Sequence, residues 1–127
     1  MEPMLRQDRD IVVIKAATAP LSTMDVAFYR RGDQYVLHRV ISCQDDSYLI
    51  RGDNTYVVEK VSRDAVLGVL VSFQRKGKTV STGNMVYKLY ARVWNAIYPL
   101  RFLYVKTKRL AMRILRHLKQ LGREKGR

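Results

Sequence analysis

The fold is decided by residues 26–42, VAFYRRGDQYVLHRVIS, in which two strand-like runs flank a glycine turn. Residues 26–30 and 34–42 are rich in the β-branched and aromatic side chains that strands favour. Gly32 and Asp33 between them are residues that tight hairpin turns use. The stretch therefore predicts an antiparallel β-hairpin.

Short strand-like runs continue on both sides of this hairpin. They cover residues 10–14, 48–50 and 66–73, and turn residues lie between them at 18–22 and 44–47. Many short strands at close spacing are typical of an antiparallel sheet or a small barrel. We therefore expect a mainly β core over residues 1–80.

The pattern changes to a helical one after Gly83. Apolar residues then recur at helical spacing, at Met85, Val86, Leu89, Tyr90, Val93, Trp94, Ile97 and Tyr98. Asn84 is suited to cap this helix, and Pro99 should end or kink it. A second amphipathic pattern follows, at Leu103, Leu110, Ile114, Leu118 and Leu121. We expect two helices within residues 84–122, ending near Gly122, and a flexible tail over 123–127.

Charge is divided unevenly along the chain of 127 residues, whose formal net charge is +13. Residues 1–74 hold 9 Lys/Arg and 10 Asp/Glu, whereas residues 75–127 hold 15 Lys/Arg and 1 acid. The basic character therefore belongs to the helical extension. Three interpretations are open for it: a solvated face on a helix packed against the core, a surface for anionic lipid, or a nucleic-acid contact.

Several classes of protein are disfavoured by composition. No run of 18 apolar residues predicts a transmembrane helix, and the first ten residues are too charged for a signal-peptide core. The single Cys43 rules out an intrachain disulfide. We expect a protein of the cytoplasm or the periphery of the cytoplasmic membrane, with no metal and no cofactor.

Three short blocks carry the chemistry: MEPML at residues 1–5, HRV at 38–40 and GDN at 52–54. A neutral imidazole such as that of His38 can accept a proton from a hydroxyl near pH 7, and Asp53 or Glu59 could orient it. Each residue also has a simpler interpretation. His38 could be a structural histidine on a strand, Asp53 a turn residue, and Glu59 a solvated charge.

In this order, the blocks resemble those of the signal peptidase I-like serine peptidases. His38 points to the branch with a Ser-His-acid apparatus, because the bacterial branch has Lys at that position. By this resemblance Glu59 matches the acid of the triad, and Asp53 the structural or assisting aspartate. Met1, Pro3 and Leu5 match the S-M-x-P-x-L box, so Met1 and Pro3 are expected to contact substrate, and Asp10 matches the acid that opens the following strand. The resemblance covers residues 1–74.

The serine of that box would stand directly before Met1, the first residue of the sequence. Without it His38 has no hydroxyl to activate, and Ser22, Thr23, Ser42 and Cys43 are poorly placed to replace it. We expect a serine to be encoded just upstream, so that this chain is a truncated and inactive form of an endopeptidase for protein precursors. The alternatives are a non-catalytic module that binds peptides and a basic nucleic-acid-binding protein.

Overall fold

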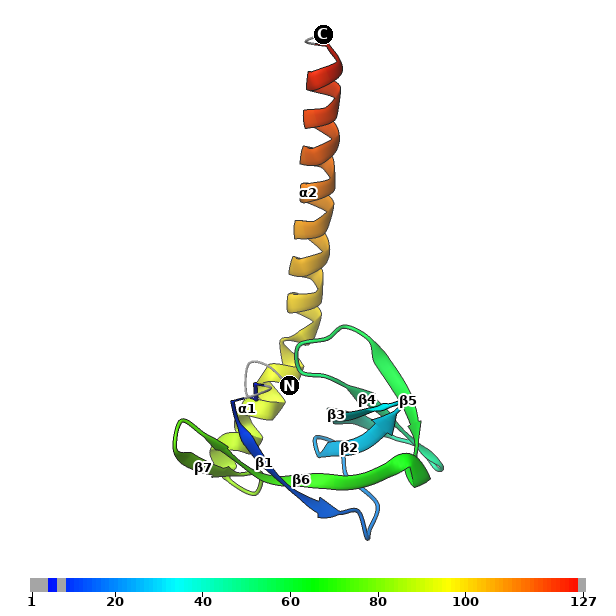
Figure 1. Ribbon diagram of the computed structural model, residues 1–127, viewed down its shortest axis with the longest axis vertical. Helices are drawn as coiled ribbons and strands as arrows, with labels where there is room; N and C mark the ends of the chain where they lie inside the picture. The colour runs from blue at the N-terminus through cyan, green and yellow to red at the C-terminus, as the bar shows by residue number, and fades with distance from the viewer. Residues whose placement is uncertain (1–4, 7–8, 126–127) are drawn as a thin grey trace. The chain divides into compact units, whose positions relative to one another are not determined.

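A seven-stranded antiparallel sheet forms the core of the protein, and two helices follow it (Figure 1). The computed structural model describes residues 5–6 and 9–125, with side chains up to residue 121. The strands are β1 (Ile11–Ala16), β2 (Val26–Arg31), β3 (Gln34–Cys43), β4 (Ser47–Arg51), β5 (Val58–Ser62), β6 (Val66–Arg75) and β7 (Lys78–Ser81). The helices are α1 (Met85–Ala96) and α2 (Tyr98–Lys125). The predicted mainly β core with a helical extension is confirmed.

The sheet has the order β1-β6-β2-β3-β4-β5, and β7 also pairs with β6. The predicted hairpin is confirmed as β2 and β3, whose register runs from Val26 opposite Arg39 to Arg31 opposite Gln34. Gly32 follows β2 with φ at +58°, the positive value that a type II′ turn needs at its first central position. The turn therefore fixes which residues of β2 and β3 face each other.

Each face of the sheet carries a buried hydrophobic cluster. One face carries a cluster that includes Ala27, Tyr29, Val40 and Ile50. The other face carries Val26, Leu70 and Phe73, which pack with Tyr87 of α1, among other residues. Because neighbours along a strand point to opposite faces, His38 shares the face of Val40 whereas Arg39 lies on the α1 face. His38 and Arg39 are therefore adjacent in the sequence but lie on opposite faces of the sheet.

One feature of the predicted helices is confirmed, and two differ from the prediction. Val86 N–H donates to Oδ1 of Asn84 at 2.8 Å, which confirms the cap of α1. The break falls before Pro99, which lies in the first turn of α2, where a missing N–H costs nothing. Helix α2 continues to Lys125, past the expected end near Gly122.

The chain divides into two compact units, Met1–Asn95 and Ala96–Arg127. The division falls later than the predicted boundary at residues 80–84, because Tyr87 and Ala91 of α1 are buried with the sheet. In the part of the chain that is described, no helix is both long and apolar enough to cross a membrane.

Candidate active site

His38 lies in the middle of β3, directly opposite Ala27 of β2. Its side chain is 13% exposed, so the ring is largely screened from solvent. Two other polar side chains reach the same face, Tyr29 from β2 and Glu59 from β5. The three residues form the cluster that we call the His38 site.

Tyr29 joins the histidine to the acid. Its hydroxyl lies 3.2 Å from Nδ1 of His38 and donates to Oε2 of Glu59 at 3.0 Å. Glu59 Oε1 is 3.7 Å from the same Nδ1, which is too long for a direct hydrogen bond. The carboxylate therefore reaches the imidazole mainly through the tyrosine hydroxyl.

These contacts require the sheet to curl. Neighbouring strands lie about 4.8 Å apart, so β2 and β5, with β3 and β4 between them, would be about 14 Å apart in a flat sheet. A hydrogen bond between Tyr29 and Glu59 bridges that separation only if this face is concave. The curl gathers residues that are distant both in the sequence and in the strand order.

The hydrogen bonds select one form of the His38 ring. A tyrosine hydroxyl has a single proton, and here it is directed to Glu59. The oxygen can then only accept from His38, so Nδ1 carries the ring proton in the neutral form. Nε2 is left with a lone pair, which is the arrangement a general base needs.

The environment keeps both partners in the required protonation states. Burial lowers the pKa of His38 below its ordinary value, and the negative charge of Glu59 opposes that shift. Burial also raises the pKa of Tyr29 well above its ordinary value, and its hydrogen bond to Glu59 adds to the effect. At neutral pH the imidazole is therefore free to accept a proton, and the tyrosine keeps its own.

Arg31 holds the acid on its other side. Its Nη1 donates to Oε1 of Glu59 at 2.6 Å, so each carboxylate oxygen has a donor. Because Arg31 is the last residue of β2, the same strand supplies both Tyr29 and the cation that fixes Glu59. Glu59 is thus a positioned acid rather than a solvated charge.

The loop after β4 contacts β3 on both faces. A Cβ at Gly52 would lie 2.9 Å from Nε2 of His38 and 3.0 Å from Oγ1 of Thr55, so only glycine leaves the ring in place. The next residue, Asp53, turns to the opposite face and pairs with Arg39. Gly52 therefore lies against the ring of His38, and Asp53 holds the side chain of Arg39, the next residue of β3.

The Asp53 carboxylate pairs with Arg39 on the face of the sheet opposite His38, which corresponds to the structural one of the two roles that the resemblance allows. Its Oδ1 and Oδ2 accept from Nε and Nη2 of Arg39 at 2.8 and 2.7 Å, and both side chains are almost fully buried. Arg39 also donates to the carbonyl of Met24 and to the hydroxyl of Tyr87. Trp94 Nε1–H donates to the Asp53 carbonyl at 2.9 Å. The GDN loop is thereby tied to β3 and α1, which makes Asp53 a structural residue.

The first box is only partly described. Met1 and Pro3, the predicted substrate contacts, lie outside the described residues. Leu5 is buried with Val26, Leu70, Phe73 and Tyr87, which anchors the end of the box in the α1-side core.

Asp10 lies directly before β1, as the first box leads one to expect. Its carboxylate accepts from the Arg9 guanidinium and from the Arg6 N–H. The hydrogen bond from Arg9 lowers the pKa of Asp10 to about 2. Asp10 therefore fastens the segment between the first box and β1.

Three of the alternative nucleophiles, Ser22, Thr23 and Cys43, make hydrogen bonds around the loop between β1 and β2. Cys43 donates to the Leu21 carbonyl at 3.4 Å, and its Sγ lies 3.9 Å from Oγ1 of Thr23. Ser22 N–H donates to Asp25. These groups belong to the loop between β1 and β2 and its contact with the end of β3.

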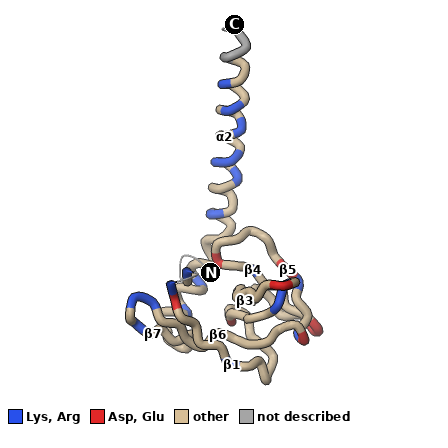
Figure 2. The backbone as a smooth tube through the Cα atoms, in the orientation of Figure 1, with Lys and Arg blue, Asp and Glu red and all other residues tan. Residues whose placement is uncertain are grey.

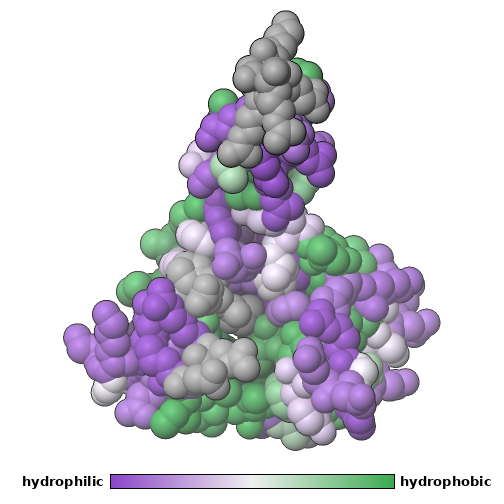
Figure 3. Space-filling view, turned by 45° about the horizontal axis from the view of Figure 1, so that its top comes forward, coloured by the Kyte–Doolittle hydropathy of each residue, from purple (hydrophilic) through white to green (hydrophobic). Residues whose placement is uncertain are grey.

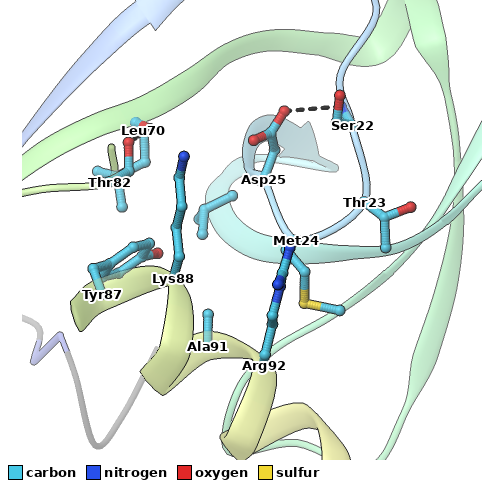
Figure 4. Close-up of a pocket in the computed structure, with 11 residues that line it drawn as sticks. Ser22, Thr23, Met24, Asp25, Leu70, Thr82, Tyr87, Lys88, Ala91 and Arg92 are labelled. Carbon is cyan, nitrogen blue, oxygen red and sulfur yellow. Dashed lines mark hydrogen bonds between the residues drawn. The ribbon is translucent and has the colours of Figure 1, made fainter. Parts of the chain in front are cut away.

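A pocket of about 270 Å³ lies between that loop and α1 (Figure 4). Figure 4 shows Lys88 and Arg92 of α1 extending toward the loop that carries Ser22 and Asp25. Val26 and Leu70 close the pocket from the sheet, on the face opposite the His38 site. The hollow is therefore separate from the imidazole and is not its substrate cleft.

Sequence reasoning missed Tyr29 and Arg31, although the hairpin held a signal for Tyr29. A two-residue turn at Gly32 and Asp33 sets Ala27 opposite His38 and puts Tyr29 one diagonal step away on the same face. Long aromatic side chains reach such diagonal neighbours. The contact of both residues with Glu59 depends on the curl of the sheet, which the sequence does not state.

Comparison with known proteins gives no relative: no protein-family model, no curated protein and no solved structure matches this chain. Among the described residues, no three His, Cys, Asp or Glu side chains gather as a metal site requires. The chemistry of the His38 site therefore has to be argued from its own geometry.

Proposed function

We propose that this chain has the base and the acid of a signal peptidase-like serine endopeptidase of the histidine branch, which hydrolyses peptide bonds in protein precursors once a serine stands before Met1. The observation that carries the proposal is the hydrogen-bonded series Glu59–Tyr29–His38, which leaves the Nε2 lone pair of His38 available. The ordered blocks of the sequence assign the same roles to His38 and Glu59. Tyr29 is an addition to that pattern.

In this mechanism the nucleophile is a serine directly before Met1, the position that the first box assigns to it. Nε2 of His38 takes the hydroxyl proton while the serine oxygen attacks the scissile carbonyl. The imidazolium that forms is stabilised by the charge of Glu59, through the Tyr29 hydroxyl and across 3.7 Å. His38 then returns the proton to the leaving amine, and water hydrolyses the acyl-enzyme with the same base.

Burial makes this base suitable for neutral pH. A histidine whose pKa lies below its ordinary value is unprotonated at pH 7 and can accept the serine proton. The negative charge of Glu59 raises the pKa of His38, and the positive charge of Arg31, which is bound to Glu59, lowers it again. The site therefore combines an acid for orientation with a ring that stays neutral before the reaction.

The test compares three proteins: the 127-residue chain, a chain extended by Gly-Gly-Ser before Met1, and a matched Gly-Gly-Ala extension. Each is incubated with a precursor-derived peptide mixture, and new termini are identified by mass spectrometry. We expect cleavage only with the serine, because losing a triad nucleophile costs on the order of a millionfold in turnover. His38→Ala in the serine-extended chain should remove cleavage, and Lys15→Ala should not.

Two results would contradict the proposal. Cleavage by the alanine-extended chain at the same rate would show that the added serine is not the nucleophile. A serine-extended chain that cleaves none of the peptides, yet binds them as strongly as its His38→Ala variant does, would instead identify a non-catalytic peptide-binding module.

A further inference from the structure

We propose that α2 lies on an anionic membrane surface, with its apolar face among the lipids and its basic face toward the headgroups. This inference does not depend on the peptidase assignment, because it rests on a different unit of the chain, Ala96–Arg127. The helix spans 28 residues, and its sequence contains nine Lys/Arg and one Glu. Figure 2 shows Lys and Arg in blue along α2.

The apolar residues of α2 form one broad face. At 100° per residue, the Leu and Ile side chains from Leu100 to Leu121 fall within an arc of about 140°, whereas Phe102, Val105 and Met112 lie outside it. A coiled-coil seam is narrower than this arc. The arc includes Leu103, Leu110, Ile114, Leu118 and Leu121. A wide apolar face is suited to burial in the fluid acyl region just below the lipid headgroups.

These apolar side chains are exposed to solvent. Leu103, Leu110 and Leu118 are each 58% exposed, Ile114 is 52% exposed and Leu121 is 46% exposed. Figure 3 shows hydrophobic residues in green beside hydrophilic ones in purple on the surface of α2. Large contiguous apolar surfaces on a protein mark sites of interaction. A partner that covers this face would remove about 25 cal/mol of unfavourable hydration for each Å² buried.

The charge of the helix selects the partner. On the same helical projection, Lys106, Arg109, Arg113 and Arg116 fall on the side opposite the leucines. Anionic lipids attract basic residues near the membrane surface, and a helix with both features has one face for each part of the bilayer. Duplex DNA would use the basic face and leave the apolar face in water. Pairing with a second copy would bring two strongly positive helices together. An anionic bilayer can bury the apolar face in its acyl region and attract the basic residues with its headgroup charge.

The aromatic side chains at the start of α2 support the same partner. Tyr98 and Phe102 stack with ring centroids 6.1 Å apart, and Nζ of Lys106 lies 6.0 Å from the Phe102 ring centroid. Aromatic rings next to basic residues are typical of the membrane–water interface. The first turns of the helix therefore contain residues suited to headgroup depth.

The experiment is flotation of the full 127-residue chain with two kinds of vesicle, phosphatidylcholine alone and equal parts of phosphatidylcholine and phosphatidylserine. We expect flotation with the mixed vesicles only, and its loss as salt is raised. Changing Arg109, Arg113 and Arg116 together to Gln should weaken partition on the order of a hundredfold. The matched control changes Lys15, Lys60 and Lys78 of the sheet unit to Gln, and it should float like the parent chain.

A second variant tests the apolar face, with Leu110, Ile114 and Leu118 changed together to Gln. We expect it to lose flotation while its net charge and its circular dichroism in the β region are unchanged. Equal partition into both vesicles, no partition, or flotation insensitive to both α2 variants would overturn the proposal. So would binding to duplex DNA, or dimerisation in sedimentation, without any vesicle binding.

Discussion

The hydroxyl of Tyr29 lies 3.2 Å from Nδ1 of His38 and links the imidazole to Glu59. The two residues are diagonal neighbours across the β2–β3 hairpin, so the hairpin register brings them together. In this arrangement Tyr29 is a positioning residue. It fixes the ring proton on Nδ1 and directs the free lone pair of Nε2 away from the acid.

The first prediction concerns this contact. Tyr29→Phe removes the acceptor for the Nδ1 proton, so the neutral ring should shift toward protonation on Nε2. Long-range ¹H–¹⁵N correlation spectra, recorded well above the His38 pKa, report the two tautomers directly. Tyr35→Phe is the control, because Tyr35 lies on the same hairpin but is 62% exposed. An unchanged tautomer ratio in Tyr29→Phe would show that the hydroxyl does not set the ring proton.

The second prediction concerns stability and pH. The folded pKa of His38 is lowered by burial, so below about pH 6.5 the unfolded chain binds a proton that the folded chain does not. Stability should therefore be fully present above pH 6.5 and be lost as pH falls through the folded pKa. Urea unfolding at a series of pH values should show a larger loss for the parent chain than for His38→Gln. Parallel curves for the two proteins would contradict the lowered pKa.

The third prediction separates Asp53 from the His38 site. Asp53→Asn leaves the buried Arg39 charge uncompensated, and this should cost about 3 kcal/mol or more of unfolding free energy. The His38 titration should move little, because Asp53 lies on the opposite face. Asp33→Asn is the control, since Asp33 is fully exposed and its substitution should leave stability almost unchanged. A small stability change together with a large shift of the His38 titration would instead show that Asp53 orients the imidazole of His38.

The fourth prediction concerns Gly52. An alanine Cβ would lie 2.9 Å from Nε2 of His38, so Gly52→Ala must displace the ring or the loop. We expect a loss of about 1–3 kcal/mol of unfolding free energy and altered His38 ring resonances. Gly83→Ala is the matched control, because its Cβ would meet only Ser81 Oγ, at an ordinary 3.5 Å. Equal behaviour of the two variants would mean that Gly52 has no steric role at the imidazole.

The sequence predicted local structure better than it predicted the site. Alternating strand residues and the Gly32 turn were sufficient for the β2–β3 hairpin, and Asn84 marked the start of α1. Strand β5 and strand β7 were not predicted, because each is only five or four residues long and largely polar. Their pairing depends on β4 and β6, so it is a tertiary effect.

Assigning the acid shows the same limit. Spacing alone could not separate Asp53 from Glu59, because both follow β4 within eight residues of Arg51. The structure separates them by face: Asp53 turns to Arg39, and Glu59 on β5 shares the concave face with His38. The side on which a loop residue emerges, and the curl that brings β5 to β2, are set by packing of the whole sheet.

If His38 is the general base for a serine placed directly before Met1, its protonation state should control the reactivity of that serine. This is measured as the rate at which a peptidyl aryl phosphonate labels the serine-extended chain, followed by intact-protein mass spectrometry and adduct mapping across pH. We expect a single adduct on the added serine, a rate that falls as His38 becomes protonated, and no adduct in His38→Ala or in the alanine-extended chain. An adduct on another residue, or labelling of the added serine that persists in His38→Ala, would contradict this role of His38.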